Sequence, residues 1–159
     1  SLSARELLTF VGRVRGFERA AIAKRITELS ARLDLGTHVD TRFEQLSKGF
    51  RRRVSLAVAL FADPPALILD EPTDGLDPNQ KRILRQDLTA IAATKAILIS
   101  THILEEVPAL CDRVYVMARG RIVFHGTPSE LEALGDGALD VAFERVTRAD
   151  FVPFNGAPV

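Results

Sequence analysis

Two short apolar runs with a helical segment between them constrain the fold of this chain more than any other feature. Residues 66–69 and 96–99 are four consecutive aliphatic residues each, bounded by proline, charged or polar residues, which favours strands buried on both faces of a parallel sheet. Between them, Asp77 and Pro78 predict a helix start, with an N-cap followed by proline at the first helical position. The apolar stripe expected on this helix is Leu84, Leu88 and Ile91. Strand, helix and strand within about 35 residues indicate a βαβ unit and an α/β fold.

The first third of the chain is predicted to be helical. Ser3 and Glu6 have the spacing of a capping box, and Gly16 ends the helix expected over 3–15. The apolar face expected for this helix is Leu7, Phe10, Val11 and Val14. A second helix is expected from Glu18 to near Gly36, with the stripe Ile22, Ile26, Leu29 and Leu33. A third is expected over 47–61, with the inward face Phe50, Val54, Ala57, Val58 and Phe61.

The remainder of the chain alternates short elements. A helix is expected over 103–110, although Pro108 weakens its second half. Residues 114–117 and 121–124 predict a hairpin. A capping box at 127–130 opens a helix to about residue 134, and a short helix is expected at about 139–147 within an otherwise irregular tail.

Composition excludes several classes of protein. The 159 residues suit one domain, and 21 basic residues balance 21 acidic ones, which argues against binding nucleic acid or an anionic membrane through bulk charge. A single cysteine, Cys111, excludes an internal disulfide and a multi-cysteine metal site. No apolar run has the length of a transmembrane helix or of a signal-peptide core. We therefore expect a soluble, intracellular α/β protein.

Asp70 and Glu71 are the first candidates for chemistry, because they directly follow the run 66–69. In open α/β sheets, ligands bind at the carboxyl ends of the strands. Asp70 suits a magnesium ion that keeps several of its waters, and Glu71 suits a base that orients a nucleophilic water. From two acids alone, the alternative that both only cap the following loop is equally good.

Two further positions have a local interpretation beside a functional one. Ser47 is placed to cap the third helix, leaving the amides of Lys48 and Gly49 at a positive helix end that attracts anions; the alternative is a plain N-cap. His102 follows the second strand, where a neutral imidazole can hydrogen-bond a phosphate oxygen; the alternative is a structural histidine. The arginines at 51–53 are expected on the outer face of the third helix, solvated or facing a partner, and His38 and His125 on the surface.

Three segments together resemble one protein family. Residues 67–77, Leu-Ile-Leu-Asp-Glu-Pro-Thr-Asp-Gly-Leu-Asp, closely resemble the Walker B and D-loop segment of the ATP-binding cassette (ABC) ATPases. Residues 46–50, Leu-Ser-Lys-Gly-Phe, resemble the signature loop of that family, and Ser-Thr-His at 100–102 resembles its switch histidine. The resemblance covers roughly residues 2–147, and 139–143 resemble the end of ATPases that serve multidrug- or gliding-type exporters.

The resemblance implies a partial P-loop NTPase fold with an incomplete, mainly parallel sheet. Residues 1–62 would be the helical subdomain that carries the signature loop, 63–135 the C-terminal part of the ATPase core and 136–159 a tail. It implies that Asp70 serves magnesium, Glu71 orients the attacking water and His102 contacts the γ-phosphate. It also implies nucleotide-binding roles for Ser47, Lys48, Gly49 and Asp77. Lys48 and Phe50 depart from the commonest signature, which has glycine and glutamine there.

The cofactors implied by the resemblance are ATP and Mg²⁺. The implied partners are a second ATPase domain and a membrane permease, which would hold the protein on the cytoplasmic face of the cell membrane; no nucleic acid is expected. The leading function is therefore ATP hydrolysis between two head-to-tail domains that drives export. The alternatives are a non-catalytic module that docks on a membrane partner or another ATPase domain, and a soluble ABC ATPase that acts on ribosomes or DNA.

One motif of the family is missing from the sequence. None of the 10 glycines is followed by Lys-Ser or Lys-Thr, so the phosphate-cradling G-x-x-x-x-G-K-[ST] loop is absent. We therefore expect little hydrolysis by this chain alone, because phosphate cradling supplies much of the catalysis in such sites. We also expect the strand at 96–100 to have an unpaired edge, which favours association with a second copy or with a missing half, or displaces the hairpin at 114–124.

Overall fold

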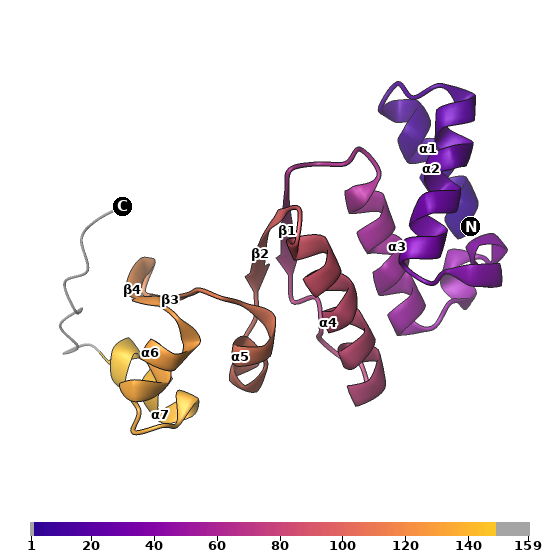
Figure 1. The fold of residues 1–159 in the computed structure, drawn as a ribbon. Coiled ribbons are helices and arrows are strands. Elements are labelled where there is room, and N and C mark those ends of the chain that lie inside the picture. Colours follow the sequence, from indigo (N-terminus) through magenta and orange to yellow (C-terminus); the bar gives the residue numbers. More distant parts are fainter. Residues whose placement is uncertain (1, 149–159) are drawn as a thin grey trace. The chain divides into compact units, whose positions relative to one another are not determined.

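The computed structural model describes residues 2–148, which fall into two compact units that divide between Thr101 and His102 (Figure 1). The first unit contains α1 (Ala4–Val14), α2 (Arg19–Arg32), 3₁₀ turns at Gly36–Asp40 and Phe43–Gln45, α3 (Lys48–Leu60), β1 (Ala66–Asp70), α4 (Pro78–Ala92) and β2 (Ala96–Ser100). The second contains a 3₁₀ turn at Leu104–Glu106, α5 (Val107–Leu110), β3 (Val114–Ala118), β4 (Arg121–Gly126), α6 (Pro128–Ala133) and α7 (Leu139–Thr147). The three-part division predicted from the sequence stays a prediction.

The two ends of α1 are confirmed as predicted. Ser3 and Glu6 form both hydrogen bonds of the capping box. At the other end the Phe17 amide bonds the Gly12 carbonyl and the Gly16 amide bonds the Arg13 carbonyl, which is the Schellman arrangement that needs the positive φ of Gly16.

The predicted apolar face of α1 is wrong at two of its four positions, while Leu7 and Val11 are half-buried. The buried residues are Ala4, Leu8 and Gly12, whereas Phe10 is 60% and Val14 69% exposed. A Cβ added at Gly12 would lie 2.7 Å from Cγ1 of Ile22 on α2. The side chains of Ile22 and Phe61 fill the space over Gly12, which a larger residue would occupy, and this packing decides which face of α1 is covered.

Helices α2 and α3 complete the core of the helical part. The four predicted stripe residues of α2 are all buried, which confirms the helical period. On α3, Val54, Ala57 and Phe61 are buried as predicted, but Phe50 and Val58 are only half-buried. Leu56 and Leu60, which the predicted inward face omits, are buried instead.

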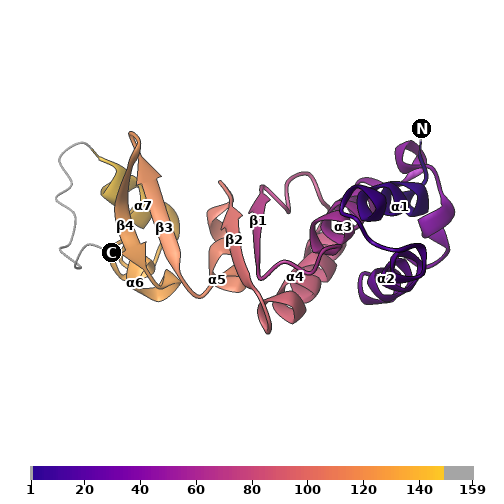
Figure 2. The ribbon, with the colours of Figure 1, turned by 90° about the horizontal axis from the view of Figure 1, so that it is seen from above.

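The βαβ unit is confirmed, with β1 and β2 parallel in a register from Ala66 opposite Ala96 to Asp70 opposite Ser100. Asp77 accepts a hydrogen bond from the Gln80 amide and Pro78 begins α4, as predicted. Figure 2 shows α4 beside β1.

The prediction that both faces of these strands are buried is wrong. Leu67 is buried, but Ile68 is 80% and Leu98 58% exposed. Because only one face of this two-stranded sheet is covered, burial alternates along each strand. Among the described residues β2 pairs with β1 alone, so the predicted association through its other edge stays a prediction.

The second unit confirms the predicted hairpin and the two helices that follow it. β3 and β4 pair antiparallel, and Arg119 and Gly120 between them both have positive φ, as a tight hairpin turn requires. Thr127 and Glu130 form the predicted capping box. The core of this unit is Val116, Leu131, Ala142 and Val146.

The helix expected over 103–110 is broken into a 3₁₀ turn and one α-helical turn. Pro108 lies at the start of that α-helical turn, where its missing amide costs no helical bond. The predicted irregular tail lies outside the described residues beyond 148. No helix in the described part of the chain is long and apolar enough to cross a membrane.

Candidate functional site

Asp70 and Glu71 stand at the carboxyl end of β1, where β2 holds both of them. The Ser100 hydroxyl donates a hydrogen bond to Oδ1 of Asp70, and the Glu71 amide donates to the Ser100 carbonyl at 3.0 Å. Sequence reasoning missed Ser100 in this role. The sequence did hold a signal for it. Asp70 and Ser100 each directly follow one of the two apolar runs, and aligning the two runs as parallel strands places Ser100 opposite Asp70.

The backbone at Glu71 turns sharply out of the strand. Its φ is +44°, in the left-handed region that side-chain-bearing residues rarely adopt. Its carbonyl accepts hydrogen bonds from the Asp74 amide at 3.2 Å and from the guanidinium of Arg52 on α3. The loop that follows the two acids is therefore tied both to β2 and to α3.

The start of α3 packs against the start of α4. The Ser47 hydroxyl accepts from the Phe50 amide at 3.3 Å, which confirms the predicted N-cap. Gly49 is buried, and a Cβ there would lie 2.8 Å from Cδ of Gln80 on α4. The two segments that resemble family motifs, 46–50 and 67–77, are thus brought together in one unit.

The side chain of Lys48 lies over the loop between β1 and α4. Its Nζ is 3.8 Å from Oδ2 of Asp74, and a Cβ on Gly75 would overlap that Nζ at 1.7 Å. Gly75 has a φ of +64°, so both its backbone conformation and the space above it favour glycine. Lys48, whose side chain is 57% exposed, therefore lies on the outer side of this loop.

The outer, solvated position expected for the arginines at 51–53 is wrong for two of them. Arg52 is half-buried against the Glu71 carbonyl. The side chain of Arg53 is only 11% exposed and bonds the Asp34 carbonyl at 3.2 Å. Arg51 bonds the Leu46 carbonyl at 3.0 Å. Long cationic side chains pack their stems on the helix and satisfy loop carbonyls that would otherwise lack a donor.

The three histidines differ in their settings. His102 is exposed, follows β2 after one intervening residue and begins the second unit. His38 is exposed as predicted, with its ring 4.2 Å from that of Phe50. His125 is half-buried rather than fully on the surface, and stacks on Tyr115.

The residues present fit a magnesium ion that arrives with a nucleotide. No group of three or more histidine, cysteine or acidic residues among those described could hold a metal alone. Mg²⁺ does not require such a group, because it binds through one or two carboxylates together with phosphate oxygens and water. Asp70, exposed at the end of β1, provides one carboxylate of that kind.

Comparison with known proteins gives a consistent result. Residues 3–74 match the model of the family described as ABC transporter. The chain is 38% identical over 131 residues to the ABC transporter ATP-binding protein NatA of Bacillus subtilis, covering 82% of this chain and 53% of that protein. It is 40% identical over 127 residues to the Nod factor export ATP-binding protein I of Cupriavidus metallidurans, covering 79% and 42%. The chain spans about half the length of the curated relatives it matches.

Solved structures agree with these relatives. An ATP-binding subunit of an ABC transporter matches with a TM-score of 0.74 and 27% identity, over 93% of this chain and 63% of that one. CbiO1 of Clostridium perfringens, part of the ABC transporter complex CbiONQ, matches with a TM-score of 0.75 and 29% identity, over 89% and 60%. These structures confirm the predicted α/β fold of the P-loop NTPase type.

Proposed function

The chain belongs to the ATP-binding domains of the ABC transporter family, and from this premise we propose that it is the part of a transport ATPase that carries the signature loop and the catalytic carboxylate. The observation that carries the proposal is the contact of Lys48 with Asp74 and of Gly49 with Gln80, which ties an anion-attracting helix end to the segment that follows two acids at a strand end. The whole protein then hydrolyses ATP to move a substrate through a membrane permease. Its relatives' names favour export.

In this proposal each acid has a distinct task. Asp70, held by the Ser100 hydroxyl, is a ligand of the Mg²⁺ that accompanies ATP, either directly or through water. Bound Mg²⁺ supplies neutralisation of charge on the phosphates. Glu71 orients the attacking water and accepts its proton. His102 hydrogen-bonds the γ-phosphate.

The remaining site residues serve a second ATPase domain. Ser47, Lys48 and Gly49 present the positive end of α3 to the γ-phosphate of a nucleotide held by that partner. Asp77, which caps α4, contacts the partner across the interface. Such an arrangement makes each site incomplete without the other domain.

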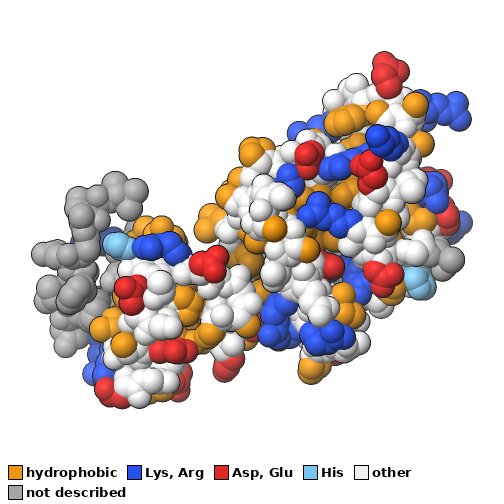
Figure 3. All heavy atoms as spheres, in the orientation of Figure 1, with side chains coloured by type: hydrophobic (Ala, Val, Ile, Leu, Met, Phe, Trp, Pro, Cys, Tyr) orange, Lys and Arg blue, Asp and Glu red, His pale blue; other side chains and the backbone are white. Residues whose placement is uncertain are grey.

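A surface on α1 and α2 suits the permease. It combines the exposed apolar residues Phe10, Val14 and Phe17 with a groove lined by Arg5, Arg13, Arg19, Ile22 and Ile26. Figure 3 shows hydrophobic and basic side chains interspersed over this part of the unit. An amphipathic helix with an acidic face would match both features. Docking there would hold the protein at the inner face of the membrane.

The test of the proposed function is MgATP turnover by the protein that carries this sequence. We expect Glu71→Gln to lower kcat by about 10²–10⁴-fold, the usual contribution of a general base, while MgATP still binds. Glu44→Gln, which alters an exposed acid in a 3₁₀ turn, is the matched control and should not change kcat. Undiminished turnover in the Glu71 variant would refute the assignment. The 159-residue chain alone should hydrolyse far less.

The same exposed surface of α1 and α2 supports the second candidate, a non-catalytic module that docks on a membrane partner. Retention of the chain by a permease with no effect of Glu71→Gln on any nucleotide turnover would favour it. Retention by RNA or DNA would favour the third, ribosome- or DNA-directed alternative.

A further inference from the structure

The backbone of Glu71 is held in a conformation that it would not keep by itself. A non-glycine residue with a φ of +44° is disfavoured by contact between its Cβ and its own backbone. Such conformations persist only where the surroundings fix them on several sides. Here the amide of Glu71 is fixed by the Ser100 carbonyl, and its carbonyl is fixed from the other side by the Asp74 amide and by Arg52.

Of these partners, Arg52 is the one from outside the βαβ unit. Ser100 belongs to β2 and Asp74 to the same loop, so both bonds are local to the sheet edge. Arg52 stands on the second turn of α3, one turn after the Ser47 cap. A guanidinium cannot lose its proton at ordinary pH, and its bond to a carbonyl is stronger than one between neutral groups.

We propose that Arg52 is a positioning residue for Glu71: by holding the Glu71 carbonyl it fixes the direction in which the catalytic carboxylate leaves β1. This inference rests on the proposed role of Glu71 in hydrolysis. It also makes α3 and the loop 71–77 one body, because Lys48 and Gly49 contact the same loop and the start of α4. A ligand that moves the start of α3 therefore moves Glu71 in the same chain.

The first test needs no nucleotide. Hydrogen exchange in the 159-residue chain is measured by NMR at the Asp74 amide, which bonds the Glu71 carbonyl, and at the Leu76 amide, which bonds the Thr73 carbonyl. Arg52→Ala should speed exchange at both about tenfold, the factor that corresponds to about 1.4 kcal/mol. Arg52→Lys, which keeps a cation and a donor, should recover part of the protection. Arg51→Ala is the matched control, because Arg51 donates to the carbonyls of Glu44 and Leu46 and not to that of Glu71.

The second test separates positioning from general stability. In the ATPase that carries this sequence, Arg52→Ala should lower kcat about tenfold, with KM for MgATP changed less than twofold, and Arg52→Lys should restore part of kcat. Unchanged exchange at the Asp74 and Leu76 amides in Arg52→Ala would overturn the inference. So would an equal loss of kcat in Arg51→Ala. A failure of the proposed function can be told apart from a failure of this inference. If the proposed function is wrong, Glu71→Gln leaves ATP turnover intact, whereas the exchange measurement still decides whether Arg52 holds the loop.

Discussion

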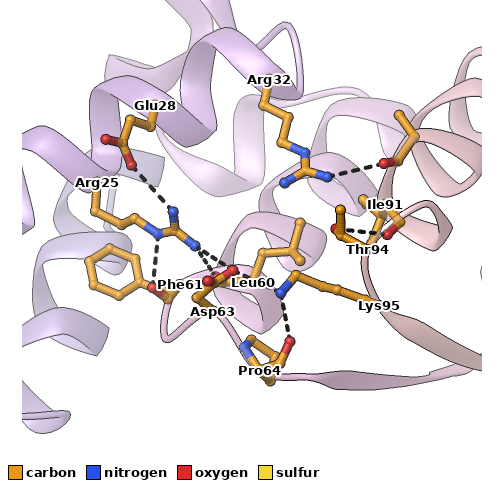
Figure 4. A network of polar contacts seen from close by, with 11 residues as sticks. Arg25, Glu28, Arg32, Leu60, Phe61, Asp63, Pro64, Ile91, Thr94 and Lys95 are labelled. Carbon is orange, nitrogen blue, oxygen red and sulfur yellow. Dashed lines mark hydrogen bonds and ion pairs between the residues drawn. The ribbon is translucent and has the colours of Figure 1, made fainter.

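Arg25 joins α2 to the end of α3, and its removal should destabilise the first unit more than any exposed substitution nearby. The guanidinium donates to the Phe61 carbonyl at 3.0 Å and to the Leu60 carbonyl at 2.9 Å, and it also contacts Glu28 and Asp63 (Figure 4). The two carbonyls belong to Leu60, the last residue of α3, and to Phe61, its C-cap, where the helix has run out of its own i+4 amides. The Leu60 carbonyl also accepts the Asp63 amide at 2.9 Å.

The magnitude follows from which of these contacts is shielded from water. The Arg25 side chain is 23% exposed, so each charged bond to a carbonyl contributes about 1–1.5 kcal/mol. The acids Glu28 and Asp63 are 45% and 68% exposed, and ion pairs of that kind contribute about 0–0.5 kcal/mol. We therefore expect Arg25→Ala to lower the free energy of unfolding of this unit by about 2–3 kcal/mol.

The assay must isolate the first unit, because a chain of two units need not unfold in one step. Hydrogen exchange at buried amides of α2 and α3 reports the opening of this unit alone, and it should become about a hundredfold faster in Arg25→Ala. Glu28→Ala keeps both carbonyl bonds, and Lys24→Ala removes an 80% exposed cation. Both controls should stay within about 0.5 kcal/mol. A loss in Glu28→Ala as large as that in Arg25→Ala would refute the reasoning, because the ion pair rather than the carbonyl bonds would then dominate.

Three further expectations concern packing and charge. Gly12→Ala should destabilise the first unit by about 1–3 kcal/mol in urea unfolding, because the new Cβ would lie 2.7 Å from Ile22; unchanged stability would mean that α1 can shift freely. Lys95 lowers the pKa of Asp63 through a hydrogen bond. The ionised carboxylate therefore stabilises the fold at pH values above its ordinary pKa of about 3.8, and this stabilisation is lost as the pH falls through the lowered pKa. Asp63→Asn should make the free energy of unfolding depend less steeply on pH on the acidic side. An unchanged pH dependence there would contradict this. Burial raises the pKa of Asp87, so stability falls as pH rises past its ordinary value; Asp87→Asn should raise Tm at pH 7, and a lower Tm would show that attraction to nearby cations prevails.

Much of the candidate site could be predicted because its determinants are local. The caps at Ser47 and Asp77 depend on a side chain bonding an amide three residues on, and both are present. The strand ends at Asp70 and Ser100 follow from where each apolar run stops. Their register then brings the carboxylate and the hydroxyl together.

The sequence by itself determined most of the order of elements, the predicted caps and the hairpin turn, since each depends on hydrogen bonds or periodicity within a few residues. It also indicated the parallel βαβ unit, through the lengths of the two apolar runs and of the helix between them. Only the tertiary structure decided which face of α1 is buried, that Ile68 is exposed and that Arg52 reaches the Glu71 carbonyl. These features depend on which distant segment lies opposite each side chain. Gly12 shows the physical reason: a residue with no side chain to bury sets the face of its helix, because only there do the side chains of Ile22 and Phe61 have room to pack.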